Sequence, residues 1–166
     1  MYDYFLRIPE MDISESQRRR IFEYYKSLPT VDKVYDCNNS FKKINYNYDI
    51  HNLKNKLKVE SRFCFVYQRP GVKINRHRDL EVNNRNTVIT IPITARIGTN
   101  WYDDDEQLVG ISDYTKGSYI INVRKLHDIH NTQKDERVML QFMIDDSFEN
   151  VVEMYNQGLL CHTIWL

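Results

Sequence analysis

Short apolar runs between about residues 61 and 145 constrain the fold of this chain most strongly. Four of them are rich in β-branched and aromatic residues and are separated by Gly, Asn and Asp clusters: 62–69, 86–97, 117–126 and 137–144. This composition and length are typical of β-strands. No helical segments of roughly 10–15 residues alternate with these runs, as a parallel sheet would require. We therefore predict an antiparallel barrel or sandwich.

Helices are expected before and after this β core. The first follows Ser14, with Gln17 in the capping-box position and Pro29 as the terminator. The segment 49–60 has apolar residues on one side and lysines on the other, and 147–160 is also amphipathic. The sequence thus predicts a mainly β (α+β) fold with two N-terminal helices and one C-terminal helix.

Length and composition favour one domain that needs no disulfide framework. The 166 residues are 42% hydrophobic, so residues 1–166 are expected to form a single domain with its own core. The three cysteines, which are widely spaced and without a CxxC pair, fit free thiols in a reducing compartment: Cys37, Cys64 and Cys161. The polar start and the lack of an apolar run of roughly 20 residues predict a cytoplasmic protein without a membrane anchor.

His77 and Asp79 stand two residues apart in the stretch "RPGVKINRHRDL", just after a Pro-Gly turn. Residues two apart in a β-strand point to the same face, so this spacing aims an imidazole and a carboxylate at one point. These two side chains supply half of a metal site. The other half must come from a distant part of the chain.

The second histidine of the site is expected at position 127. His130 and His162 are the other downstream candidates, but His127 follows the end of the predicted strand 117–126. Arg137 comes ten residues after His127, at the start of the next predicted strand. In an antiparallel pair, these two positions can face each other near one rim of a barrel.

These residue types favour a specific chemistry. Two histidines and one carboxylate on one face of Fe(II) leave three coordination positions open, as in the facial triad of non-haem iron oxygenases. A guanidinium such as that of Arg137 can hold a distal carboxylate through two parallel hydrogen bonds, which suits a dicarboxylate cosubstrate.

The same residues resemble the Fe(II)/2-oxoglutarate dioxygenase superfamily, and most closely its aspartyl/asparaginyl β-hydroxylase and phage-type hydroxylase branch. The similarity runs from about Phe63 to Ile144. Its most specific part is Pro-Gly followed by His-x-Asp, then His, an Asn four residues on and an Arg ten residues on. This sequence fills the pattern with Pro70, Gly71, His77, Asp79, His127, Asn131 and Arg137.

The resemblance implies a double-stranded β-helix, a jelly-roll or cupin-like barrel, that works as an enzyme. His77, Asp79 and His127 would bind Fe(II), and Arg137 would bind 2-oxoglutarate. Molecular oxygen would convert the cosubstrate to succinate and carbon dioxide, while a C–H bond of a small molecule, an amino acid or a peptide side chain is hydroxylated. The phage-type branch also implies that the protein can be virus-encoded and act in a host cytoplasm.

Four further positions can be compared with this superfamily. Gln68 stands where prolyl-hydroxylase relatives carry a cosubstrate-contacting tyrosine, and Val66 stands where β-hydroxylase relatives carry a serine, so both are departures. Arg85 matches a basic position that helps to bind cosubstrate or substrate in some relatives. Asn131 either contacts the cosubstrate or turns the chain between strands, since Asn tolerates left-handed geometry.

Two other functions stay open from the sequence. One is a cupin-like protein that binds a metal, or nothing, without turnover, although such a scaffold has no need of Arg137. The other is a nucleoside or nucleic-acid hydroxylase, for which Lys54, Lys56 and Lys58 could form a basic patch. The balance of 23 basic and 23 acidic residues argues against binding dominated by phosphates.

Overall fold

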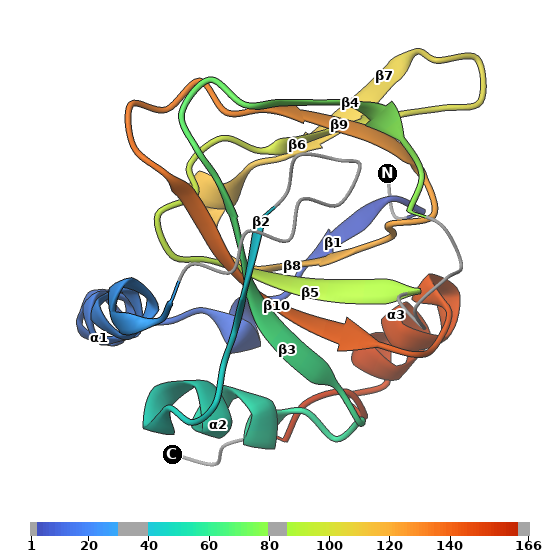
Figure 1. The fold of residues 1–166 in the computed structure, drawn as a ribbon. Helices are drawn as coiled ribbons and strands as arrows, with labels where there is room; N and C mark the ends of the chain where they lie inside the picture. The colour runs from blue at the N-terminus through green and yellow to red at the C-terminus, as the bar shows by residue number, and fades with distance from the viewer. Residues whose placement is uncertain (1–2, 30–39, 80–85, 163–166) are drawn as a thin grey trace.

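Two antiparallel sheets lie face to face in the structure, a computed structural model that describes residues 3–29, 40–79 and 86–162 (Figure 1). The large sheet has the order β1-β8-β5-β10-β3-β2 and the small sheet the order β4-β9-β6-β7. The large sheet consists of β1 (Phe5–Arg7), β2 (Ser40–Lys43), β3 (Arg62–Gln68), β5 (Thr87–Pro92), β8 (Tyr119–Ile121) and β10 (Arg137–Ile144). The small sheet consists of β4 (Lys73–His77), β6 (Thr99–Tyr102), β7 (Leu108–Ser112) and β9 (Leu126–His130). This arrangement is a jelly roll, as predicted.

In the described part of the chain, three helices cover the large sheet on the side away from the small one (Figure 1). They are α1 (Glu15–Ser27), α2 (Tyr48–Lys56) and α3 (Phe148–Asn156), and two short 3-10 helices, η1 (Pro9–Met11) and η2 (Tyr114–Lys116), lie in connections. The predicted helices are confirmed, although α2 and α3 end earlier than the predicted segments 49–60 and 147–160. In the described residues, no helix has both the length and the apolar composition needed to cross a bilayer.

The capping box predicted for α1 is present. The Ser14 Oγ accepts a hydrogen bond from the Gln17 backbone N–H at 3.2 Å, and the Gln17 side chain accepts one from the Ser14 N–H at 3.0 Å. We expect Ser14→Ala to lower the free energy of unfolding by about 1 kcal/mol, because the Gln17 N–H loses its side-chain acceptor. Urea denaturation should measure this loss. Ser14→Thr keeps the hydroxyl and should stay close to wild type, whereas equal losses in both variants would contradict the capping role.

Side chains of β10 alternate between two cores. Val138 and Leu140 pack in the core between the large sheet and the helices, whereas Met139 packs between the two sheets. Because successive side chains of a strand point to opposite faces, Arg137 and Gln141 share the inward face of Met139. The strand therefore brings a cation and an amide into the interior of the barrel.

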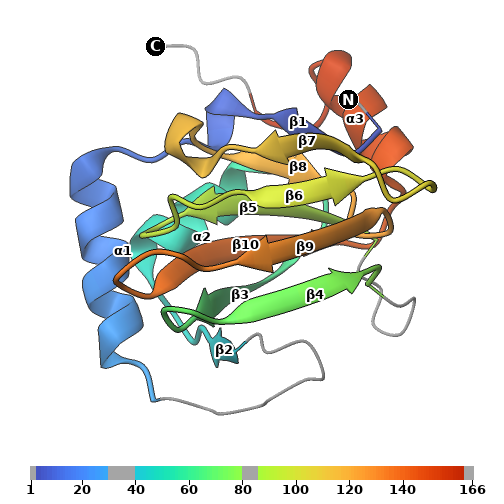
Figure 2. The ribbon, with the colours of Figure 1, turned by 90° about the horizontal axis from the view of Figure 1, so that it is seen from above.

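The predicted strand 117–126 is wrong as a single strand. β8 ends at Ile121, the chain turns through residues 122–125, and β9 begins in the other sheet. Asn122 closes this turn, because its carbonyl accepts from the Lys125 N–H at 3.0 Å and its side chain accepts from the Arg124 N–H at 3.2 Å. The turn could not be predicted from the apolar run because Val123, which lies in the turn, is apolar and buried like the residues of a strand. Figure 2 shows β9 lying over the large sheet rather than within it.

This turn also corrects the expected pairing of His127 with Arg137. β9 pairs with β4 and β6, whereas β10 pairs with β3 and β5. The two residues belong to different sheets, so they do not face each other across an antiparallel pair.

Other strand boundaries also differ from the prediction. The run 86–97 forms a strand only as far as Pro92, which has no backbone N–H to continue a ladder. The segment 98–116, which lies between two predicted strands, holds β6 and β7, and neither these strands nor β1 and β2 are among the predicted ones. These four strands are only three to five residues long. Strands this short are stabilised by the partners that flank them rather than by a strong local pattern.

Candidate metal centre

His77, Asp79 and His127 converge at one end of the barrel. Their potential ligand atoms all lie within 4.8 Å of one another. The Oδ1 of Asp79 is 3.2 Å from Nε2 of His77 and 3.8 Å from Nε2 of His127. Donors bound to one ion at about 2.1 Å have separations of this order. The three side chains predicted from the sequence therefore come together as one group.

The small sheet positions both histidines. His77 is the last residue of β4 and lies directly opposite His127 of β9, and their ring centroids are 4.4 Å apart. On its other side, His127 lies opposite Trp101 of β6, whose ring centroid is 5.0 Å from the imidazole. Trp101 is fully buried, so it packs against His127 and limits how the imidazole can turn.

Asp79 lies beyond the end of β4, so the same-face argument used for the His-x-Asp spacing does not apply to it as a strand residue. Its backbone N–H instead donates to the carbonyl of Val123 at 2.9 Å, in the turn between β8 and β9. A contact between distant parts of the chain therefore brings this carboxylate to the histidines.

Hydrogen bonds to backbone carbonyls indicate the tautomer of each histidine. The Nδ1 of His77 is 2.8 Å from the carbonyl oxygen of Asn75, and the Nδ1 of His127 is 2.8 Å from that of Lys125. Since a carbonyl only accepts, each Nδ1 acts as the donor, and Nε2 is the ring atom of each histidine that faces Asp79. Two imidazole Nε2 atoms and one carboxylate therefore lie close together. The donor set thus fits a divalent metal ion.

A cavity between the two sheets adjoins the three side chains. Its other lining residues are Val66, Thr99, Tyr114, Ile121, Val123, Ile129, Met139 and Gln141. Apart from the three candidate ligands, the wall combines apolar side chains with the polar groups of Thr99, Tyr114 and Gln141. The Thr99 and Tyr114 hydroxyls are 3.2 Å apart, and the Gln141 amide donates to the Thr90 hydroxyl at 3.3 Å. Apolar walls with a few polar groups are typical of sites for small ligands.

Arg137 is a fully buried cation at the start of β10. Its Nε donates to the carbonyl of Ile97 at 2.9 Å and its Nη1 to the side-chain oxygen of Gln68 at 3.3 Å. Its guanidinium carbon is 5.1 Å from the ring centre of Tyr114, a residue of the cavity wall. Gln68, predicted to lie near the cosubstrate, is therefore a direct neighbour of Arg137.

The charge of Arg137 lacks a counterion in the part of the chain that the structure describes. Its Nη2 has no hydrogen-bond partner there, and no described carboxylate forms an ion pair with it. Burial lowers the pKa of Arg137 below its ordinary value, and the nearby Tyr114 hydroxyl acts in the opposite direction. Because a buried, incompletely paired charge costs free energy, this guanidinium fits an anionic ligand such as a carboxylate.

The other candidate residues lie outside the group of three potential ligands. Asn131 is buried, and its amide donates to the carbonyls of Gln68 at 3.0 Å and Arg69 at 3.1 Å and accepts from the Gln133 N–H at 3.1 Å. These bonds join the chain turns on either side of it, as in the turn interpretation, and its contact with a cosubstrate stays a prediction.

His130 is exposed and lies outside the group of three. Cys37 and Arg85 lie outside the described residues.

Sequence reasoning missed the polar residues of the cavity. Tyr114 and Thr99 come from the segment 98–116, for which no strand is predicted, and no local pattern points to them. Gln141 could have been found, because Arg137, Met139 and Gln141 recur every second residue along a predicted strand.

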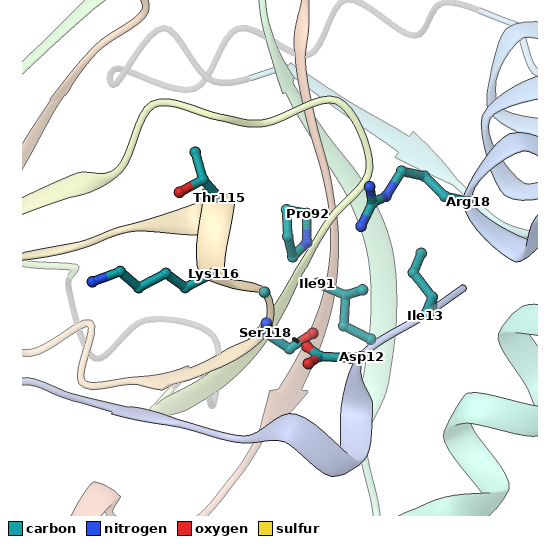
Figure 3. A pocket seen from close by; sticks show the side chains of 9 residues that line it. Asp12, Ile13, Arg18, Ile91, Pro92, Thr115, Lys116 and Ser118 are labelled. Carbon is teal, nitrogen blue, oxygen red and sulfur yellow. Dashed lines mark hydrogen bonds between the residues drawn. The ribbon is translucent and has the colours of Figure 1, made fainter. Parts of the chain in front are cut away.

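A second pocket lies away from these residues, beside η2 and the end of β5 (Figure 3). Arg18 and Lys116 border it, but the hydroxyl of Thr115 bonds to Asp113 and that of Ser118 to the carbonyl of Met11. Its hydroxyl groups are therefore already used within the protein. None of the candidate residues predicted from the sequence lies there.

Solved structures share the fold of this chain. No protein-family model and no curated protein sequence matches it. A prolyl-4-hydroxylase from Pseudomonas putida aligns with a TM-score of 0.57 and 10% identity, over 86% of this chain and 92% of that one. A 2OG-Fe(II) oxygenase family oxidoreductase from Burkholderia pseudomallei aligns with a TM-score of 0.58 and 10% identity, over 84% and 82%.

HygX from Streptomyces hygroscopicus, solved with nickel, 2-oxoglutarate and hygromycin B bound, also aligns, with a TM-score of 0.56 and 10% identity, over 85% of this chain and 82% of that one. At such identities the similarity establishes the architecture. The chain therefore has the jelly-roll fold found in solved 2-oxoglutarate- and Fe(II)-dependent oxygenases.

Proposed function

We propose that this protein is an Fe(II)- and 2-oxoglutarate-dependent dioxygenase that hydroxylates a C–H bond. The observation that carries the proposal is the convergence of His77, Asp79 and His127 in a barrel whose interior also holds Arg137, a buried cation that lacks a described counterion. A non-catalytic scaffold would gain nothing from keeping such a charge. The shared fold with solved oxygenases supports the same conclusion.

In this proposal, the Nε2 atoms of the two histidines and the Asp79 carboxylate hold the iron on one face. When bound, iron and 2-oxoglutarate activate molecular oxygen, which yields succinate, carbon dioxide and a hydroxylated product. Arg137 pairs with the distal carboxylate of 2-oxoglutarate, and Gln68 orients the guanidinium through its Nη1. The Tyr114 ring centre is 5.1 Å from the guanidinium carbon, so its hydroxyl is a candidate donor to the same carboxylate.

The substrate is proposed to be a small molecule, an amino acid or a peptide side chain. Solved structures of the same fold include a prolyl-4-hydroxylase and a protein with hygromycin B bound. Placement in the aspartyl/asparaginyl β-hydroxylase or phage-type branch, the single-domain organisation and the cytoplasmic location stay predictions.

Succinate formation tests the proposal. Under anaerobic conditions, Fe(II) and 2-oxoglutarate should together produce a weak visible charge-transfer band, because both would bind the same site. Admission of oxygen should then produce succinate even without substrate, measured by mass spectrometry. Candidate peptides, amino acids and nucleosides are screened in the same reactions for a mass gain of one oxygen atom. Absence of both the band and succinate would instead support the cupin-like scaffold.

A further inference from the structure

The turn of residues 122–125, between β8 and β9, contacts two of the three proposed metal ligands. The carbonyl of Val123 accepts from the Asp79 N–H at 2.9 Å, and the carbonyl of Lys125 lies 2.8 Å from Nδ1 of His127. His77, by contrast, is bonded to the carbonyl of Asn75 within its own strand. The turn therefore sets the position of Asp79 relative to His127.

Arg124, in the middle of this turn, adds contacts through its side chain. Its Nη1 donates to the backbone carbonyl of Asp79 at 3.2 Å. Its Nε and Nη2 donate to the side-chain oxygen of Asn86 at 3.2 and 2.6 Å. The Asn86 amide in turn donates to the Asp145 carboxylate at 3.2 Å, beyond the end of β10. A chain of side-chain bonds therefore runs from the segment after β10 to the backbone of Asp79.

We propose that Arg124 is a positioning residue for the metal centre: it holds the backbone of Asp79 so that the carboxylate meets Nε2 of His77 and His127. Asp79 needs such support because β4 ends at His77 and the ladder does not extend to it. The turn supplies a partner for its N–H through Val123 and for its carbonyl through Arg124. This inference rests on the proposed function, because it takes Asp79 as a metal ligand.

A simple stabilising role for Arg124 makes a different prediction from a positioning role. Residues that orient metal ligands typically change metal affinity by about 10–100-fold when they are replaced. Replacement of a residue that only joins two chain segments lowers the melting temperature but leaves the affinity of the folded protein for metal unchanged. Metal binding by folded protein therefore separates the two roles without any measurement of turnover.

The experiment measures the dissociation constant for Co(II) by calorimetry, together with the visible absorption of bound Co(II), which reports ligand geometry. Arg124→Met should bind Co(II) about 10–100-fold more weakly than wild type and show an altered spectrum. Arg124→Lys should lie between the two, since an ammonium keeps the charge but lacks the planar fork. Asn86→Ala should weaken binding less, because Arg124 keeps its bond to Asp79. The matched control is Arg96→Met, which removes an exposed arginine paired with Asp135.

The outcomes separate this inference from the function on which it rests. If wild type binds no Co(II), the proposed metal site is wrong. If wild type binds Co(II) and Arg124→Met binds it with the same affinity and spectrum, the metal site stands and the positioning role is overturned. Circular dichroism establishes that each variant is folded. Should Arg124→Met fail to fold, the Lys and Asn86→Ala variants decide, and wild-type affinity in both overturns the proposal.

Discussion

Asp79→Ala is expected to abolish binding of Fe(II) and of its substitute Co(II). The Asp79 carboxylate is the only charged ligand of the proposed set, and its Oδ1 is the atom from which both Nε2 distances, 3.2 and 3.8 Å, are measured. Its loss leaves two neutral imidazoles, so the affinity should fall by more than the roughly 100-fold upper range for residues that only orient a ligand. Calorimetry with Co(II) measures the effect, and Asp79→Asn, which keeps the shape but not the charge, should behave similarly.

Paired histidine variants sharpen this test. His127→Ala should lose metal binding in the same way, whereas His130→Ala should keep wild-type affinity, because His130 is exposed and lies outside the group of three. The opposite result would move the site to residue 130 and would contradict the geometry described above.

Arg137→Met is expected to weaken the binding of 2-oxoglutarate without lowering the stability of the protein. Loss of a buried charge-assisted partner typically costs about 2–5 kcal/mol of affinity. The dissociation constant for 2-oxoglutarate, measured with Mn(II) present, should therefore rise by roughly 30-fold or more. In the absence of cosubstrate, the free energy of unfolding should stay within about 1 kcal/mol of wild type or increase, because replacing a buried ionic group with an apolar one is often neutral or stabilising.

Wild type provides the complementary measurement. Its melting temperature should rise when Mn(II) and 2-oxoglutarate are added together, because a ligand that binds only the folded state stabilises it. Arg137→Met should show the increase with Mn(II) but little further increase with 2-oxoglutarate. Unchanged affinity for 2-oxoglutarate in this variant would show that Arg137 has another role.

The sequence predicted which three residues come together better than it predicted the topology that brings them together. The His77 and Asp79 spacing and the choice of His127 needed only a residue pattern, and the structure brings these three together. The pairing of His127 with Arg137 was wrong because periodicity along a strand does not show to which sheet the strand belongs. The turn at residues 122–125, which moves the chain between sheets, lies inside an apolar run.

Residues that act through distant contacts could not be predicted. Arg124 meets Asn86 across 38 positions and Asp79 across 45, and neither contact leaves a local signature. Tyr114 reaches the cavity from a short 3-10 helix within a segment rich in acids and glycine. In contrast, the cap of α1 depends only on Ser14 and Gln17, three positions apart, so local chemistry was sufficient to predict it.

The two halves of the proposed site are anchored in opposite walls of the barrel. Both imidazoles belong to the small sheet, whereas the guanidinium that would receive the organic acid belongs to the large one. A mutation in the large sheet can therefore change the affinity for the organic acid without changing the affinity for the metal ion. A mutation in the small sheet can do the reverse. Such independence lets a lineage change one specificity at a time, provided that the packing between the walls keeps their separation constant.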